Sequence, residues 1–310
     1  MIRIITVIPL LAFFISCQPE GLNCDVQEVV LLEEIPGASG ITKHDEKVFV
    51  IGDNSPFLFE MDNEYHVIDK TPVYSTQKLD GKRINKASKP DFEALECIGD
   101  ELFIFGSGSK SPERDIFVRT NANITQNTEH FNMSAFYENL KQMEVMADAE
   151  LNIEGLAYYN DSLYLLNRSN NVIFIFDYDW FLLYITGDAD FKEPEHVSHA
   201  LPSIRGIEAG LSGAAIGLDP PHLIFTASVE NTANAYDDGE ILGSFIGMVK
   251  ISEINDQSAC RFVEITGSKN PLKVESVCID KNRKDRKVDL LLTTDSDGGH
   301  SHLMRCCLEY

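Results

Sequence analysis

The chain has 310 residues, of which 44% are hydrophobic, so it can bury a large core and does not have the composition of a disordered or collagenous protein. Its 49 acidic residues outnumber its 26 basic residues and give a formal net charge of −23. A surface of this charge repels nucleic acid and anionic lipid headgroups. We therefore expect no nucleic-acid partner, and the charge suits an exported protein that is solvated on all sides.

The N-terminus has the features of an export signal. Arg3 gives it a positive charge, and residues 4–15 form an apolar run that is too short to span a membrane. Residues 14–17 (Phe-Ile-Ser-Cys) resemble a bacterial lipobox, in which the cysteine becomes lipidated. We expect a signal peptide over residues 1–16, a lipidated Cys17 with a tether over residues 17–25, and a lipid anchor in the outer membrane, on its periplasmic or surface face. An ordinary secretory signal with a chance cysteine is the alternative.

Six cysteines follow the predicted anchor, and they form no CxxC pair or zinc-like spacing. Export permits disulfides, but several of these cysteines lie in apolar runs, where buried free thiols are favoured. The six are Cys24, Cys97, Cys260, Cys278, Cys306 and Cys307.

A short motif recurs five times along the chain: a small or acidic residue precedes an apolar run. The leading residues are Ser39, Glu93, Glu154, Ser212 and Glu275. This spacing, roughly 60 residues, suits one four-stranded propeller blade with its loops. The sequence therefore predicts an all-β fold, a five-bladed β-propeller over residues 26–310. Six blades are the alternative, if an insert hides a degenerate blade.

Each leading residue is followed by two more apolar runs, which predict the second and third strands of a blade. The last repeat ends after three strands, so we expect the segment Val26–Glu33 to supply its outer strand and close the ring. Fourth strands are predicted near Val67, Thr125, Leu182 and Phe262.

Two inserts interrupt the repeats. Residues 75–90 are polar and are expected to form a loop. Residues 134–149 have a helix-forming composition, which predicts one surface helix with Ser134 as its N-cap. No linker divides the chain, so a single propeller domain is expected.

The five leading residues are expected to form a column inside the propeller. The innermost strand of every blade lines the central channel, so equivalent positions converge on one axis. Three carboxylates in a narrow channel repel one another unless a cation balances them, and calcium accepts six to eight oxygen ligands. The sequence therefore predicts one calcium ion, catalytic or structural, bound by Ser39, Glu93, Glu154, Ser212 and Glu275. The alternative is that backbone amides satisfy these side chains.

The order Ser, Glu, Glu, Ser, Glu, one per repeat, resembles the central calcium site of the calcium-activated nucleotidases (apyrases), which are five-bladed propellers. The repeat around Phe92-Glu93-Ala94-Leu95 is also similar, and looser similarity extends to phytase-like and gluconolactonase-like propellers. The resemblance covers most of residues 38–308 and implies hydrolysis of a phosphate ester or anhydride. The chain departs from that family at Asp53-Asn54-Ser55, where the nucleotidases carry an Asp-Asp-Arg type segment.

Polar side chains also end the second strand of each repeat, where the channel mouth is expected. Candidate catalytic groups there are Asp53, Arg168, Glu230 and Asp295, with an acid as general base. Lys110 and Arg114 are candidate ligand-binding residues that, like Arg168, suit a phosphate. The alternative, which explains these residues equally well, is that they are polar only because they lie in solvent-exposed loops.

Two functions follow from these features. The first is a calcium-dependent hydrolase of a phosphorylated small molecule at the channel mouth. The second is a non-catalytic propeller, with structural calcium, that binds a glycan, peptide or protein partner. The missing Asp-Arg pair favours the second, whereas the ring of acids and arginine favours the first. The fold alone does not decide between them, and a monomer is expected in both cases.

Overall fold

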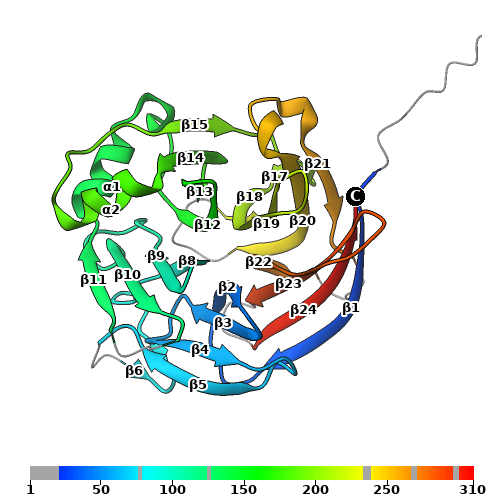
Figure 1. Cartoon of the computed structure of the whole chain (residues 1–310), viewed down its shortest axis with the longest axis horizontal. Coiled ribbons are helices and arrows are strands. Elements are labelled where there is room, and N and C mark those ends of the chain that lie inside the picture. Colours follow the sequence, from blue (N-terminus) through cyan, green and yellow to red (C-terminus); the bar gives the residue numbers. More distant parts are fainter. Residues whose placement is uncertain (1–20, 76–78, 124–126, 233–238, 267–270, 296–299) are drawn as a thin grey trace, which may run out of the picture.

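The computed structural model describes residues 21–75, 79–123, 127–232, 239–266, 271–295 and 300–310. Five four-stranded antiparallel sheets follow one another around a ring, which confirms the five-bladed β-propeller (Figure 1). No sixth blade occurs in these ranges.

Four blades are each built from consecutive strands, with the first strand innermost. The first blade contains β2 (Ala38–His44), β3 (Lys47–Gly52), β4 (Phe57–Met61) and β5 (Val67–Pro72). The second contains β8 (Phe92–Ile98), β9 (Glu101–Gly106), β10 (Ile116–Asn121) and β11 (Glu129–Asn132). The third contains β12 (Ile153–Tyr159), β13 (Ser162–Asn167), β14 (Val172–Asp177) and β15 (Glu195–Ser198). The fourth contains β18 (Gly210–Gly217), β19 (His222–Asn231), β20 (Glu240–Lys250) and β21 (Arg261–Glu264).

The fifth blade joins the two ends of the chain. It contains β22 (Lys273–Asn282), β23 (Lys287–Asp295), β24 (Ser301–Glu309) and, as its outer strand, β1 (Asn23–Leu32). Figure 1 shows the blue β1 alongside the red β24, and the two pair antiparallel from Asn23 with Glu309 to Leu32 with Ser301. The predicted ring closure is confirmed. Because β1 begins at Asn23, the last residues of the expected tether belong to the propeller, while Cys17 lies outside the described residues.

Hydrogen bonds between side chains and backbone hold the first blade against the fifth. The amide of Ala38 donates to Ser301 Oγ at 2.9 Å, and the amide of Ile41 donates to Ser276 Oγ at 3.2 Å. Both amides belong to β2, the innermost strand of the first blade. The junction where the chain closes on itself is therefore sealed near the channel as well as at the outer edge.

The fourth strand predicted near Leu182 is wrong, because that segment forms the helix α2 (Tyr178–Thr186). Asp177 caps this helix by accepting a hydrogen bond from the amide of Trp180 at 2.7 Å, and Gly187 ends it with φ of 83°. Phe181 of this helix is buried in a core cluster and Leu182 packs against the cluster, whereas Leu183 is exposed. The outer strand of the third blade is β15, further along the chain.

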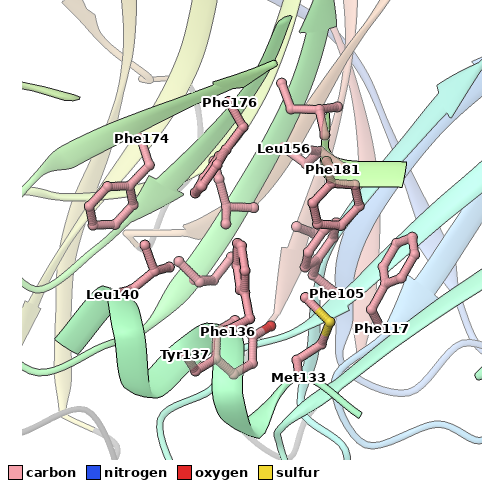
Figure 2. Packing of buried hydrophobic residues seen from close by; sticks show 14 of the residues in the cluster. Phe105, Phe117, Met133, Phe136, Tyr137, Leu140, Leu156, Phe174, Phe176 and Phe181 are labelled. Carbon is pink, nitrogen blue, oxygen red and sulfur yellow. The ribbon is translucent and has the colours of Figure 1, made fainter. Parts of the chain in front are cut away.

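The predicted surface helix is shorter and more buried than expected. It comprises α1 (Ser134–Lys141) and a 3₁₀ turn, Glu144–Met146, and its N-cap is Met133, so the prediction of Ser134 as cap is wrong. Ser134 Oγ instead donates to Asp115 at 2.8 Å. Figure 2 shows the aromatic cluster between the second and third blades, with Phe136 of α1 facing Phe181 of α2.

The remaining short elements lie in connections. The expected loop over residues 75–90 contains a hairpin of β6 (Leu79–Asp80) and β7 (Arg83–Ile84). A second hairpin consists of β16 (Ser203–Ile204) and β17 (Ile207–Glu208). The fourth strands predicted near Val67 and Phe262 are confirmed as β5 and β21. The one predicted near Thr125 falls outside the described residues, and β11 follows it.

All six cysteines after residue 21 are free thiols; Cys278, Cys306 and Cys307 are buried, whereas Cys24, Cys97 and Cys260 are only partly buried. Among the described helices, none combines the length and apolar character needed to cross a membrane.

Candidate functional site

A β-bulge falls at the column residue of every inner strand. The register between first and second strands shifts between Ala38 and Gly40, and it shifts at the equivalent place in the other four blades. A bulge leaves one residue without a direct partner and turns its side chain away from the regular sheet face. The sequence motif therefore marks a β-bulge that occurs at the same place in the inner strand of each blade. The residues at these bulges are Ser39, Glu93, Glu154, Ser212 and Glu275.

The two serines of the column join neighbouring blades. Ser39 Oγ donates to the carbonyl oxygen of Phe92 in the second blade. Ser212 Oγ lies 2.9 Å from the carbonyl oxygen of Val274, in the fifth blade. Both hydroxyl groups are thus used in contacts between inner strands, a role that the sequence analysis did not assign.

Two glutamates of the column face basic side chains. Glu154 Oε2 lies 3.8 Å from Arg168, and its Oε1 accepts a hydrogen bond from Asn152 at 2.7 Å. Glu275 Oε1 lies 3.1 Å from Lys273 Nζ. These cations supply part of the counter-charge that the sequence analysis assigned to calcium alone.

Glu93 lies in an acidic cluster with Asp53 and Asp91. One ligand atom from each of the three residues lies within 4.8 Å of the others. The Lys89 ammonium contacts the Asp53 carboxylate and lies 2.6 Å from Asp91 Oδ1. Arg114 contacts the other oxygen of Asp91. The cluster therefore holds two basic side chains, both from the segment around the second blade.

Sequence reasoning missed Asp91, Asn152 and Lys273, although a signal was present. Each lies two residues before a column residue, and alternate residues of a strand share a face. A second column thus runs beside the first, nearer the channel mouth. Its members are Gly37, Asp91, Asn152, Gly210 and Lys273.

A small cavity of 80 Å³, which we call the inner cavity, lies between these columns. Six carboxylates and four basic side chains line it, so with every group charged its wall carries a net formal charge of −2. The acids are Asp53, Asp91, Glu93, Glu154, Glu275 and Asp295, and the bases are Lys86, Lys89, Arg114 and Lys273.

Burial and mutual repulsion perturb the acids of the inner cavity. Burial, followed by Asp91 and Glu154, raises the pKa of Glu93 well above its ordinary value. Burial also raises the pKa of Glu154 to about 7, although Arg168 opposes the shift. The pKa of Asp91 is lowered, because Lys89 and Arg114 outweigh its burial. The basic side chains thus neutralise one part of the cluster and leave another short of positive charge.

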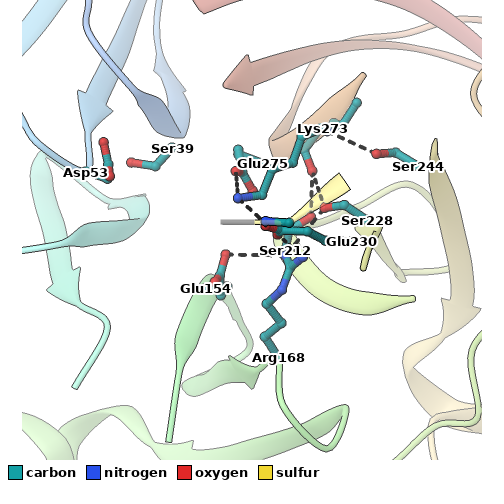
Figure 3. A network of polar contacts seen from close by, with 12 residues as sticks. Ser39, Asp53, Glu154, Arg168, Ser212, Ser228, Glu230, Ser244, Lys273 and Glu275 are labelled. Carbon is teal, nitrogen blue, oxygen red and sulfur yellow. Dashed lines mark hydrogen bonds and ion pairs between the residues drawn. The ribbon is translucent and has the colours of Figure 1, made fainter. Parts of the chain in front are cut away.

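A larger cavity of 520 Å³, the outer cavity, opens beside the third and fourth blades. Asn152, Glu154 and Lys273 line both cavities and form the wall between them. Figure 3 shows Arg168 reaching toward Glu230 and Glu154 in this region. Glu230 lies 3.4 Å from Arg168 and 3.3 Å from Lys273, so one buried carboxylate connects the two cations.

Arg168 lies against a glycine. A Cβ atom at Gly210 would lie 2.7 Å from Arg168 Cγ, closer than a side chain tolerates. Gly210 therefore leaves the space that Arg168 occupies at the edge of the outer cavity. Gly210 belongs to β18, so the inner strand of the fourth blade determines where the Arg168 side chain lies.

The predicted mouth residues divide between the two cavities. Asp53 and Asp295 line the inner cavity, whereas Arg168 and Glu230 line the outer one. Arg114 is only 3% exposed and is bound to Asp91 and to Ser109 Oγ. Lys110 lines neither cavity. The residues proposed to bind a phosphate are therefore not gathered in one place.

Comparisons with known proteins support the fold. Glutaminyl cyclase from Myxococcus xanthus matches with a TM-score of 0.53 at 8% identity, covering 93% of this chain and 97% of that chain. The PQQ-bound aldose sugar dehydrogenase from Streptomyces coelicolor matches with a TM-score of 0.51 at 10% identity, covering 94% of this chain and 99% of that chain. Similarity at such low identity shows a shared fold alone.

Two sequence comparisons complete these findings. Residues 34–308 match the model of a family described as "Family of unknown function (DUF6929)". No curated protein matches the chain. The matched range includes the five column residues and the lining of both cavities.

Proposed function

The chain belongs to the DUF6929 family, whose function is unknown, and we propose that it binds a small hydroxyl-rich molecule, such as a sugar, in the outer cavity. The observation that carries this proposal is the outer cavity itself. Its volume of 520 Å³ falls within the range of small-molecule sites, and its wall combines hydrogen-bond donors and acceptors with few apolar groups. Arg168 and Asn152 supply donors on this wall, while Glu154 and Glu230 supply acceptors.

Charge favours a neutral ligand over a phosphorylated one. Five acidic residues and two basic residues line the outer cavity, and both basic residues already face Glu230. A phosphate would meet more negative than positive charge there. Among the described residues that line this cavity, none is aromatic, so this part of the wall offers no ring on which a nucleotide base stacks. The glycan-binding alternative from the sequence therefore has better support than nucleotide hydrolysis.

The test compares a panel of neutral sugars with the corresponding sugar phosphates by calorimetric titration. We expect at least one neutral sugar to bind more tightly than its phosphate. Glu230→Gln frees positive charge on Arg168 and Lys273, so it should reverse that preference. Glu240→Gln is the matched control, because Glu240 is exposed, pairs with Arg205 and does not line the outer cavity. A preference for phosphates in the unaltered protein would overturn the proposal.

Hydrolysis of such a ligand is a second candidate, favoured by Glu154. A carboxyl group whose pKa is about 7 is suited to both donate and accept a proton at neutral pH. In this case Glu154 acts as the general acid, and Asn152 orients it by donating to Oε1. The rate should follow an ionisation near pH 7 that disappears in Glu154→Gln. If a broad screen of glycosides and esters releases no product, binding without hydrolysis remains the proposed function.

Calcium at the five-residue column and the lipid anchor at Cys17 stay predictions of the sequence. The column fits a cation only in part, since its serine hydroxyls donate to carbonyl groups and two of its glutamates face Arg168 and Lys273. For this reason the proposed ligand binding does not depend on a bound ion.

A further inference from the structure

We propose that Asp53, Asp91 and Glu93 form a divalent-cation site beside the channel axis, which the Lys89 ammonium occupies until a cation displaces it. This site differs from the five-residue column, because only Glu93 belongs to both. It also lies outside the outer cavity, to which neither Asp53 nor Asp91 contributes. The inference therefore goes beyond sugar binding.

The geometry of the three carboxylates fits an ion without rearrangement of the backbone. Calcium binds oxygen at about 2.3–2.6 Å, so two oxygens on opposite sides of one ion lie about 5 Å apart. The ligand atoms of Asp53, Asp91 and Glu93 lie within 4.8 Å of one another. Asp53 directly follows β3, whereas Asp91 directly precedes β8 and Glu93 lies at its bulge. Two rigid neighbouring blades thus fix the positions of these residues.

A buried oxygen without a partner points to the same place. Glu275 is 5% exposed and lines the inner cavity together with the three acids. Its Oε2 has no hydrogen-bond partner, whereas its Oε1 faces Lys273. An unsatisfied buried carboxylate oxygen is costly, and a cation or its bound water satisfies it. Figure 3 shows Glu275 across the channel from Asp53 and Ser39.

The Lys89 ammonium occupies the position proposed for the ion. Its side chain is 12% exposed, and its ammonium group bridges Asp53 and Asp91. A lysine carries a compact charge on a flexible stem, so it can withdraw. Arg114 is 3% exposed and also bound to Ser109, which holds it in place.

Charge and ligand type favour calcium or a similar hard cation. With every group ionised, a state that a bound cation favours, the wall of the inner cavity carries a net formal charge of −2, which one divalent ion balances. All candidate ligands are carboxylate oxygens, which suit calcium or magnesium rather than soft metals. The inner cavity of 80 Å³ holds an ion with little water and no larger ligand.

The experiment titrates calcium chloride into the full-length protein after treatment with EDTA and removal of the chelate. Binding is measured by calorimetry, and thermal unfolding is followed in the same samples. We expect one ion per chain and a rise in melting temperature. Asp91→Asn should weaken calcium binding by about tenfold or more, because affinity follows the number of charged ligands. Ser212→Ala, which alters only the predicted column, should leave calcium affinity unchanged.

Lys89→Met supplies a gain-of-affinity test that does not depend on a damaged ligand. Removal of the competing ammonium should raise calcium affinity by about tenfold or more. If Asp91→Asn fails to fold, Asp53→Asn replaces it. The proposal is overturned if the unaltered protein binds no calcium, if Ser212→Ala rather than Asp91→Asn abolishes binding, or if Lys89→Met leaves affinity unchanged. Sugar binding is measured separately, so failure here leaves the outer cavity untouched.

Discussion

Gly213 lies so close to Ser276 that a Cβ atom at Gly213 would be 2.3 Å from the Cα atom of Ser276 in the next blade. Gly155 stands in the same relation to Ser212, whose carbonyl oxygen would lie 2.5 Å from the added Cβ. Each glycine directly follows a column residue. These glycines permit the close approach of the inner strands and so help to set the width of the channel at the bulges.

Gly213→Ala should lower the free energy of unfolding by about 3 kcal/mol, because the added methyl group forces two inner strands apart. Chemical denaturation measures this loss. Gly21→Ala is the control, since no atom lies within 4 Å of a Cβ at that position. Equal stability of the two variants would show that the blades yield to the methyl group and that the close approach is unimportant.

Ser39→Ala should lower the free energy of unfolding by about 1–2 kcal/mol, because it removes a buried hydrogen bond to Phe92 and leaves the carbonyl less satisfied. The same method applies, with the exposed Ser75→Ala as control. A loss no larger than that of the control would contradict the role of Ser39 in joining two blades.

Glu96 should give the fold a defined pH dependence. Burial raises the pKa of Glu96 to about 8, although the amide of Cys97 donates to it at 2.8 Å. In the unfolded chain the carboxyl group ionises near pH 4.3, so between these values the folded state holds the extra proton. Its contribution to stability is thus fully present below pH 4.3 and is lost as the pH rises through 8.

Glu96→Gln removes this dependence, since the amide stays neutral. Urea unfolding at pH 5 and at pH 9 should show that the variant loses less stability than the unaltered protein on going to the higher pH. The other perturbed acids contribute to both proteins and cancel in the comparison. Parallel pH profiles for the two proteins would rule out burial of a protonated Glu96.

The blade count and the column were predictable because they follow from a repeated local pattern. Each second strand is a nearly continuous apolar run, which burial between blades requires, and the polar residue near the start of each first strand marks a bulge. The closure by β1 followed from the missing outer strand of the last repeat. By contrast, the segment around Leu182 is as apolar as a strand, and the cap at Asp177 decided in favour of a helix.

The charge balance of the channel was not predictable from the column alone. Lys89 comes from the connection that leads into β8, where no repeat marks it as a neighbour of the acids, and Lys273 was marked only by its place two residues before Glu275. Three unpaired carboxylates were therefore expected in the channel, whereas two of them, Glu154 and Glu275, face cations in the structure. The outer cavity likewise depends on how two blades meet, which no single repeat encodes.

The lipid anchor that the sequence predicts at Cys17 can be tested in cells. Cys17→Ala should release the protein from the membrane fraction into a soluble one, because a lipidated cysteine is its only expected attachment. Fractionation followed by immunoblotting measures this. A variant that stays with the membranes would show that another contact holds the protein there.

Calorimetric titration of neutral sugars into the unaltered protein and into Glu230→Gln tests the central claim most directly. Our account predicts saturable binding of a neutral sugar to the unaltered protein and its weakening by about tenfold in the variant, because Glu230 both accepts hydrogen bonds and holds Arg168 and Lys273 in place. Binding of phosphorylated sugars alone, or sugar binding that Glu230→Gln leaves unchanged, would contradict it.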